Sequence, residues 1–166
     1  MALLKNTELL ATFRDKITGS TAITSWLTTN YPTTTLKVFT GIDQKNPPGE
    51  ADAPFVCLIP SSAVLGETTD SQQYSMEIVV GMVDDSFAYS AITKATEMRG
   101  LFNLDSLCHL VIEELRALSI VQNWIADSIN LQNDSITYFP LHMGTIGITS
   151  SFQTVLGYDI KLNGAE

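Results

Sequence analysis

Three pairs of carboxylates are the residues in this chain best suited by type to acid–base chemistry. They are Glu50 with Asp52, Asp84 with Asp85, and Glu113 with Glu114. A glycosidase needs two carboxylates that face each other across a cleft about 5–10 Å wide. Adjacent residues on a helix or in a turn diverge instead. We therefore expect the pair at 113–114 to be solvated and the pair at 84–85 to cap the start of a helix.

Two histidines and two cysteines are the remaining residues that could bind a metal or act as nucleophiles. His109 directly follows Cys108 in a helical pattern, so the two side chains project about 100° apart and cannot share a metal. We expect His109 and His142 at the surface or in an interface. Cys57 and Cys108 both lie in apolar surroundings and are expected to be buried free thiols. No ligand spacing typical of zinc is present, so the sequence predicts no metal site and no cofactor.

Serine and glycine motifs do not provide an active site either. Ser61-Ser62 and Ser150-Ser151 lie in no GxSxG turn, which a hydrolase of that type requires. The segment 144–147 has two glycines but not the GxGxxG spacing of a phosphate-binding loop. Within a strand, such glycines are expected to mark a bulge or a close approach of the backbone. We predict no catalytic residue and no enzymatic activity.

The periodicity of apolar residues predicts the elements that position these groups. Helices are expected over 3–18, 22–29 and 87–98, and from Asn103 or Asp105 to Leu118, with a further turn over 121–129. Strands are expected over 36–40, 54–59, 73–83, 135–142 and 144–162, the last two forming a hairpin around Met143 and Gly144. This order predicts a single α+β domain over 1–166, with a mainly antiparallel sheet and helices packed on one face.

Composition restricts the classes of partner. The chain has 166 residues, and its 18 acidic and 9 basic residues leave a formal charge of −9. This charge argues against ordinary binding to nucleic acid, which requires lysine and arginine to neutralise phosphates. No secretory signal and no membrane-spanning run are visible, so we expect a protein that is cytosolic when made and contacts no membrane.

Two long polar segments are the candidate contact regions. The segments 41–53 and 60–72 flank the apolar strand expected at 54–59, and both are expected to be loops. Loops of about 12 residues without structure of their own are often functional, although ordinary solvent loops are an equal alternative. The candidate interface residues are Pro47, Pro48 and Glu50 in the first segment and Glu67, Thr68, Thr69 and Asp70 in the second.

The order of these parts resembles the phage tail terminator proteins, also called tail-completion or minor tail proteins. The resemblance lies in the strand ending at Gly41, the proline-rich loop, the apolar strand 54–59, and the polar loop with Glu67-Thr68-Thr69 before the strand Tyr74–Val83. A helix and a C-terminal hairpin follow. The resemblance implies a homo-hexameric ring that caps the tail tube, ends its elongation and joins it to the head through a head-completion or neck protein. DNA would pass through this ring without specific binding.

The same resemblance implies assembly in the host cytoplasm and a final place at the head-proximal end of the virion tail. The chain departs from the family pattern in its N-terminal part, because two helices are expected where one long helix is usual. A different neck or head–tail connector subunit therefore remains an alternative. A small cytosolic binding domain unrelated to phage is the other alternative.

Overall fold

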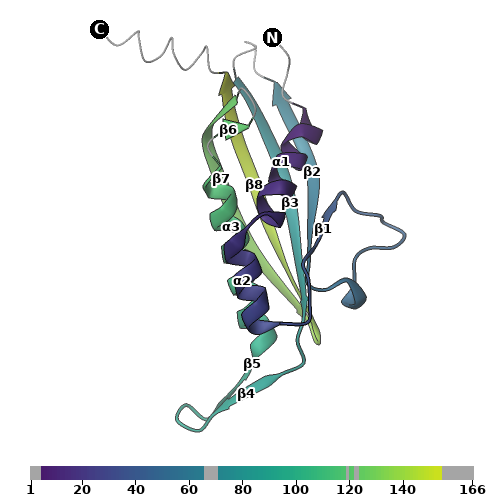
Figure 1. Cartoon of the computed structure of the whole chain (residues 1–166), viewed down its shortest axis with the longest axis vertical. Helices are drawn as coiled ribbons and strands as arrows, with labels where there is room; N and C mark the ends of the chain where they lie inside the picture. The colour runs from purple at the N-terminus through teal and green to yellow at the C-terminus, as the bar shows by residue number, and fades with distance from the viewer. Residues whose placement is uncertain (1–4, 66–70, 119, 122–123, 155–166) are drawn as a thin grey trace.

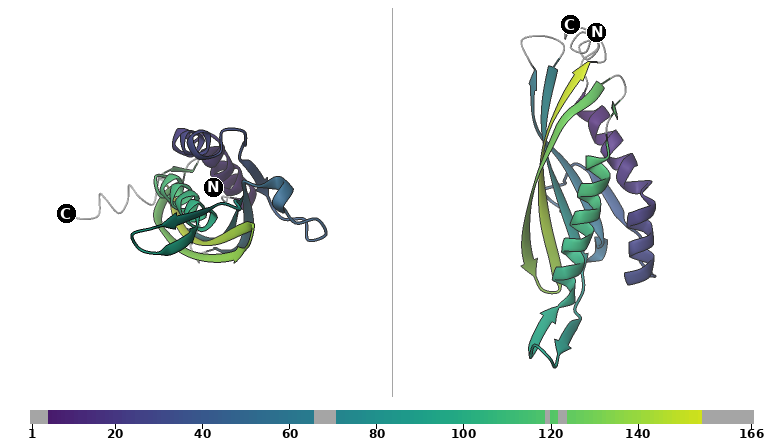
Figure 2. Two further views of the ribbon diagram at one scale, coloured as in Figure 1. Left: turned by 90° about the horizontal axis from the view of Figure 1, so that it is seen from below. Right: turned by 90° about the vertical axis from the view of Figure 1, so that its left-hand side faces the viewer.

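The protein has two layers, a long twisted sheet and a layer of helices on one of its faces (Figure 1; Figure 2). The structure, a computed structural model, describes residues 5–65, 71–118, 120–121 and 124–154. In spatial order, the six strands of the sheet are β1 (Lys37–Thr40), β2 (Phe55–Leu65), β3 (Ser71–Val83), β8 (Leu141–Thr154), β7 (Trp124–Tyr138) and β6 (Ile120–Val121). Only the β1–β2 pairing is parallel among these described strands. The predicted α+β class is confirmed.

The first two helices are α1 (Asn6–Thr18) and α2 (Thr21–Asn30), close to the predicted ranges. Gly19 ends α1, and Ser20 caps α2, its hydroxyl oxygen accepting a hydrogen bond from the Ile23 amide at 3.1 Å. The same hydroxyl donates to Glu114 at 2.7 Å. Glu114 also pairs with Lys16 at 3.2 Å. These contacts fix the corner between α1 and α2 against the third helix.

The core lies between the sheet and α3 (Arg99–Arg116) together with α1. One stripe of α3 is apolar, and its buried members include Leu104, Leu107, Cys108, Val111 and Leu115. The strand β3 turns its predicted apolar face to the same core with Tyr74, Met76, Ile78, Val80 and Met82. Apolar burial on this scale is the main stabilising contribution in a folded domain.

The loop predicted over 60–72 is wrong for 60–65 and 71–72, which are strand residues, and its middle part, 66–70, lies outside the described residues. β2 continues to Leu65 and β3 begins at Ser71, so the two strands form a long antiparallel hairpin. Pro60 favours a loop in the sequence, but here it lies beside a register shift between Pro60 and Ser62. A bulge is one of the few places where a strand tolerates proline. Because β1 pairs with β2 only as far as Leu58, the small polar residues that follow are exposed to solvent.

The helix predicted over 87–98 is also wrong, because these residues form a second, two-stranded sheet. Its strands are β4 (Phe87–Ser90) and β5 (Ala95–Met98). Lys94 in the connecting turn has a φ of 54°, a conformation that a right-handed helix excludes. The expected helix start at Asp84 and Asp85 is wrong for the same reason, since a strand follows them.

The start of α3 differs from the prediction as well. The helix begins at Arg99, before the cap expected at Asn103 or Asp105. Gly100 lies in the first turn of α3. A β-carbon at this position would lie 2.2 Å from Nε2 of His142, so the close packing of α3 on β8 requires glycine here.

The C-terminal hairpin is longer than predicted, and its turn is displaced. β7 includes residues 124–129, where a helical turn was expected, and the hairpin turns at Phe139 and Pro140, not at Met143 and Gly144. The part of the predicted strand beyond Thr154 lies outside the described residues. β7 is polar, and its pairing with β8 along its length holds it in the sheet. The spacing of its own apolar residues does not indicate this pairing.

Within the described ranges, no helix combines the length and the apolar character that crossing a membrane requires.

Candidate protein interface

Of the candidate interface residues from the sequence, the structure describes Pro47, Pro48 and Glu50. Pro47 and Glu50 are exposed and Pro48 is half-buried, all on the segment between β1 and β2, which includes the short 3₁₀ helix η1 (Glu50–Asp52). Glu67, Thr68, Thr69 and Asp70 lie outside the described residues.

The exposed apolar residues gather elsewhere, on a hairpin that projects past one end of the main sheet (Figure 1). We call residues 87–98, which comprise β4, β5 and their turn, the hairpin arm. Its register pairs Phe87 with Met98 and Tyr89 with Thr96. Because alternate residues of a strand face opposite sides, these four side chains share one face. All four are exposed, and Tyr89 has 67% of its surface open to solvent.

An aromatic stripe continues from this face onto the main sheet. Phe87 contacts Phe139 of the β7–β8 turn with ring centroids 5.3 Å apart. We define the aromatic stripe as Phe139, Phe87 and Tyr89. Ile92, in the turn of the arm, is 95% exposed. Of the described large apolar residues that are exposed, all except Ile42 belong to this arm, to the first turn of α3 or to Phe139. Such concentration is typical of a protein contact surface.

The opposite face of the hairpin arm borders a polar groove of about 550 Å³. Ala88 and Glu97 from the arm line it, together with the end of α2 and the first turns of α3. At its base, the Tyr31 hydroxyl donates to Asp84 at 2.6 Å and accepts from the Asn103 amide at 2.6 Å. Asn103 also donates to Asp84 at 3.1 Å. This polar network joins α2, α3 and the segment that leads into the arm.

The electrostatics of the network are consistent with a structural role. Burial and the hydrogen bond to Asp84 raise the pKa of Tyr31 well above its usual range. Burial alone would raise the pKa of Asp84, but hydrogen bonds from Ser86, Tyr31 and Asn103 outweigh this and hold it below its ordinary value. At neutral pH the network therefore contains a neutral phenol and an ionised carboxylate, both satisfied. It holds the root of the arm in place.

His142 and Gly144 explain how tightly β8 packs beneath α3. His142, expected at the surface or an interface, is instead fully buried, and its Nε2 lies 3.1 Å from the Asp84 carbonyl oxygen. The close approach expected at Gly144 is confirmed, because a β-carbon there would lie 2.9 Å from Sγ of Cys108. His109 is exposed on α3, as predicted.

The remaining candidates for chemistry are occupied with structural contacts. Asp52 pairs with Lys37 at 3.0 Å, and Glu114 is held by its contacts with α1 and the α2 cap. The cysteines are buried and free, as predicted, and burial raises the pKa of Cys108 to about 12. Within the described residues, no group of three or more histidine, cysteine or acidic side chains is arranged to hold a metal ion.

Sequence reasoning missed this surface because it assigned residues 87–98 to a helix. The alternation of Phe87, Tyr89, and then Thr96 and Met98 around a four-residue turn was the available signal. Four-residue strands are too short to show a clear period of two against a helical pattern.

Comparison with known proteins gives a likeness at the level of structure. The sequence matches no family model and no curated protein. Among solved structures, the fold is similar to that of a chain in the virion of a native gene transfer agent particle. The TM-score is 0.57 at 10% sequence identity, and the match covers 87% of this chain and 94% of the other. At this identity the likeness establishes a shared fold over nearly the whole length of both chains.

Proposed function

We propose that the protein is a structural component of a phage or phage-like particle that caps the tail tube as a ring. The observation that carries this proposal is the fold shared with a chain of the gene transfer agent virion, which covers 87% of this protein. The order of elements supports the same reading, because it resembles that of tail terminator proteins. The protein would then act by binding and not by catalysis.

The mechanism follows from the two faces that a ring of subunits presents. One face of the ring occupies the end of the tube and prevents the addition of another tube subunit, while the other face binds a neck or head-completion protein. A ring of identical subunits needs two different contact surfaces on each copy. The hairpin arm is an exposed apolar surface of the required kind. The formal charge of −9 suits a channel that repels DNA and lets it pass.

The proposal is tested by adding the purified chain to polymerising tail tube protein from the same genome. Electron microscopy measures tube length, and sedimentation measures how much of the chain co-purifies with tubes. We expect shorter tubes with a ring at one end and about one ring of this chain per tube. Tubes of unchanged length, with the chain left in the monomer fraction, would refute the proposal. A chain that decorates the whole tube would also refute a capping role.

A further inference from the structure

A second apolar surface lies on the helical layer. A groove of about 360 Å³ runs between α1, α2 and the segment that leads from α2 into β1. We call it the helix groove. Its lining includes the buried side chains of Ile17, Ile23 and Leu27 and the half-buried Leu36. Its volume falls within the roughly 300–1,000 Å³ range of protein binding pockets. None of the residues that line it carries a charge.

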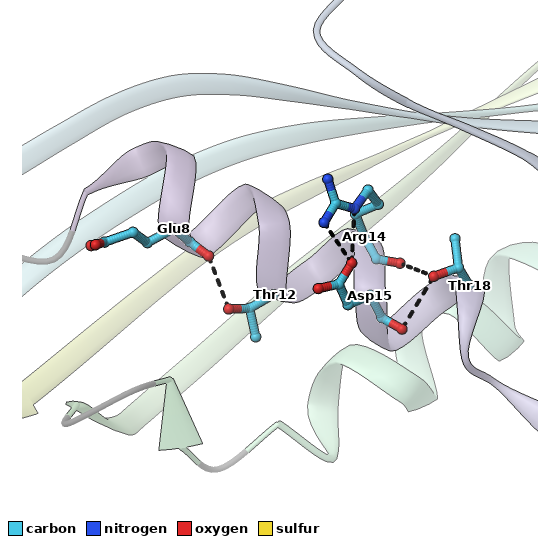
Figure 3. Close-up of polar contacts among 5 residues, drawn as sticks. All are labelled: Glu8, Thr12, Arg14, Asp15 and Thr18. Atoms are coloured by element: carbon cyan, nitrogen blue, oxygen red, sulfur yellow. Dashed lines mark hydrogen bonds and ion pairs between the residues drawn. The ribbon is translucent and has the colours of Figure 1, made fainter.

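Five threonines line the helix groove, and four of them, Thr18, Thr24, Thr28 and Thr34, donate their hydroxyl proton to a carbonyl of the chain. Thr18 donates its hydroxyl proton to the Arg14 carbonyl at 3.0 Å (Figure 3). Thr24 donates to the Ser20 carbonyl at 2.9 Å, and Thr28 donates to the Thr24 carbonyl at 2.9 Å. Covering an unsatisfied hydroxyl donor would cost desolvation free energy. Because these four donors keep their partners, an apolar surface can cover them without that cost.

The helix groove and the aromatic stripe are alike in being uncharged as well as largely apolar. Neither surface contains an ionisable group apart from the phenol of Tyr89, although the chain as a whole has a formal charge of −9. Two copies of so acidic a chain repel each other over most of their surfaces. A contact between copies is therefore favoured where both surfaces lack carboxylates, and these two surfaces meet that condition.

The hairpin arm itself is suited to be the inserted part. It is a two-stranded sheet that does not pair with the main sheet, and isolated two-stranded hairpins are only marginally stable in water. Packing of its aromatic face on a partner would supply the burial that the arm lacks in the single chain. Its most exposed residue, Ile92, lies in the turn, where it would meet a partner first.

We propose that the hairpin arm of one copy docks in the helix groove of a neighbouring copy. This inference rests on the proposed function, in which identical copies form a ring, and it names the contact that closes the ring. The two surfaces are different parts of the same chain, so the contact is heterologous, as a closed ring of one kind of subunit requires.

Cysteine cross-linking between two single variants tests the proposal directly. One variant carries Ile92→Cys in the arm, and the other carries Thr24→Cys at the groove; both positions are exposed. The native cysteines are buried and do not compete. The variants are mixed with tail tube protein and oxidised mildly. We expect a disulfide-linked dimer in the mixture and little in either variant alone. Ser62→Cys, exposed on β2, replaces the groove variant as the control and should give no dimer.

Tyr89→Asp provides a second, independent measurement. The residue is 67% exposed, so the variant should fold with an unchanged melting temperature. A carboxylate in the stripe should weaken cross-linking and ring formation roughly tenfold or more, because it would be buried in an apolar groove without a partner. Thr96→Asp on the same face should act in the same direction. Glu97→Gln on the opposite face serves as the neutral control.

The outcomes separate this inference from the proposed function. Normal capping of tubes without a cross-link between the Ile92→Cys and Thr24→Cys variants overturns the docking contact but leaves the capping function standing. Normal ring formation by the Tyr89→Asp variant overturns it as well. Cross-linking of the arm to the tube protein instead of to a second copy would identify the tube as its partner and also overturn it. If the wild-type chain neither caps tubes nor associates, both proposals fail.

Discussion

Replacing Tyr31 by phenylalanine removes one hydroxyl from the polar network at the root of the hairpin arm and nothing else. In the wild type, this hydroxyl donates to Asp84 at 2.6 Å and accepts from Asn103 at 2.6 Å. A hydrogen bond to a charged group contributes about 1.5–3 kcal/mol to stability. Asp84 keeps its bonds from Ser86 and from Asn103 in the variant, so it is not left unpaired. We therefore expect a loss at the lower end of that range, about 1.5 kcal/mol at neutral pH.

This loss of stability should become smaller both at low pH and at high pH. The folded-state pKa of Asp84 is lowered, so its contribution is present above the unfolded value of about 3.9 and disappears as the pH falls through the folded value. The folded-state pKa of Tyr31 is raised, so its contribution is present below about pH 10 and disappears as the pH rises. The difference in unfolding free energy between wild type and variant should be greatest between about pH 5 and 9 and should shrink on both sides.

Thermal and urea unfolding followed by circular dichroism measure this difference. A loss of about 1.5 kcal/mol in a chain of this length corresponds to a melting temperature lower by roughly 3–6 °C. Tyr89→Phe is the matched control, because its exposed phenol should contribute less than about 0.5 kcal/mol. Equal stability of the Tyr31 and Tyr89 variants, or a difference that does not vary with pH, would refute the role assigned to the network.

Three further predictions concern the packing of the core. Gly144→Ala should lower the free energy of unfolding by about 1–3 kcal/mol, because the added methyl meets Sγ of Cys108 at 2.9 Å; Gly49→Ala, with open space around it, should be nearly neutral in the same urea titration. Cys57 and Cys108 should both resist a thiol reagent at about pH 8 until the chain is unfolded, since burial raises the pKa of each thiol; rapid labelling of the native protein would contradict their placement. Leu107→Ala should cost about 2–5 kcal/mol by creating a cavity in the core, and a change in urea midpoint equivalent to less than about 1 kcal/mol would contradict its full burial.

The parts of the fold that were predictable from sequence are those in which local periodicity and burial agree. The stripe on α3 repeats at the helical period from Leu104 to Leu115, and each predicted member in that range is buried. The alternation from Tyr74 to Met82 in β3 is equally clear, and its apolar face meets the same core. In both elements, one face packs against the core, so the spacing of the apolar residues indicates which face is buried.

Parts of two strands could not be predicted because they form through pairing with other strands, not through their own residue pattern. β7 is largely polar between Asn130 and Thr137, and it is a strand because β8 pairs with it residue by residue. The extension of β2 beyond Pro60 depends in the same way on β3. A single chain carries no local signal for such pairing, and tertiary context overrides the weak preference of polar residues.

The exposed apolar surface of the hairpin arm was not predicted from the sequence. The candidate contact residues were placed on the polar segments 41–53 and 60–72, because length and polarity are the visible signs of a loop. The exposed aromatic side chains of Phe87 and Tyr89 were assigned to a helix, where they would have been read as core. Recognising that they are uncovered required knowing that β4 and β5 stand apart from the main sheet.

The length distribution of tail tubes assembled with and without this chain is the decisive measurement for the capping function. Tube protein is polymerised alone, with the wild-type chain, and with the Tyr89→Asp variant, and tubes are measured by electron microscopy. We expect the wild-type chain to shorten the tubes and to form one ring at one end of each, while the variant at the same concentration does so far less. Identical length distributions in all three samples, with no ring at either end, would contradict the capping function.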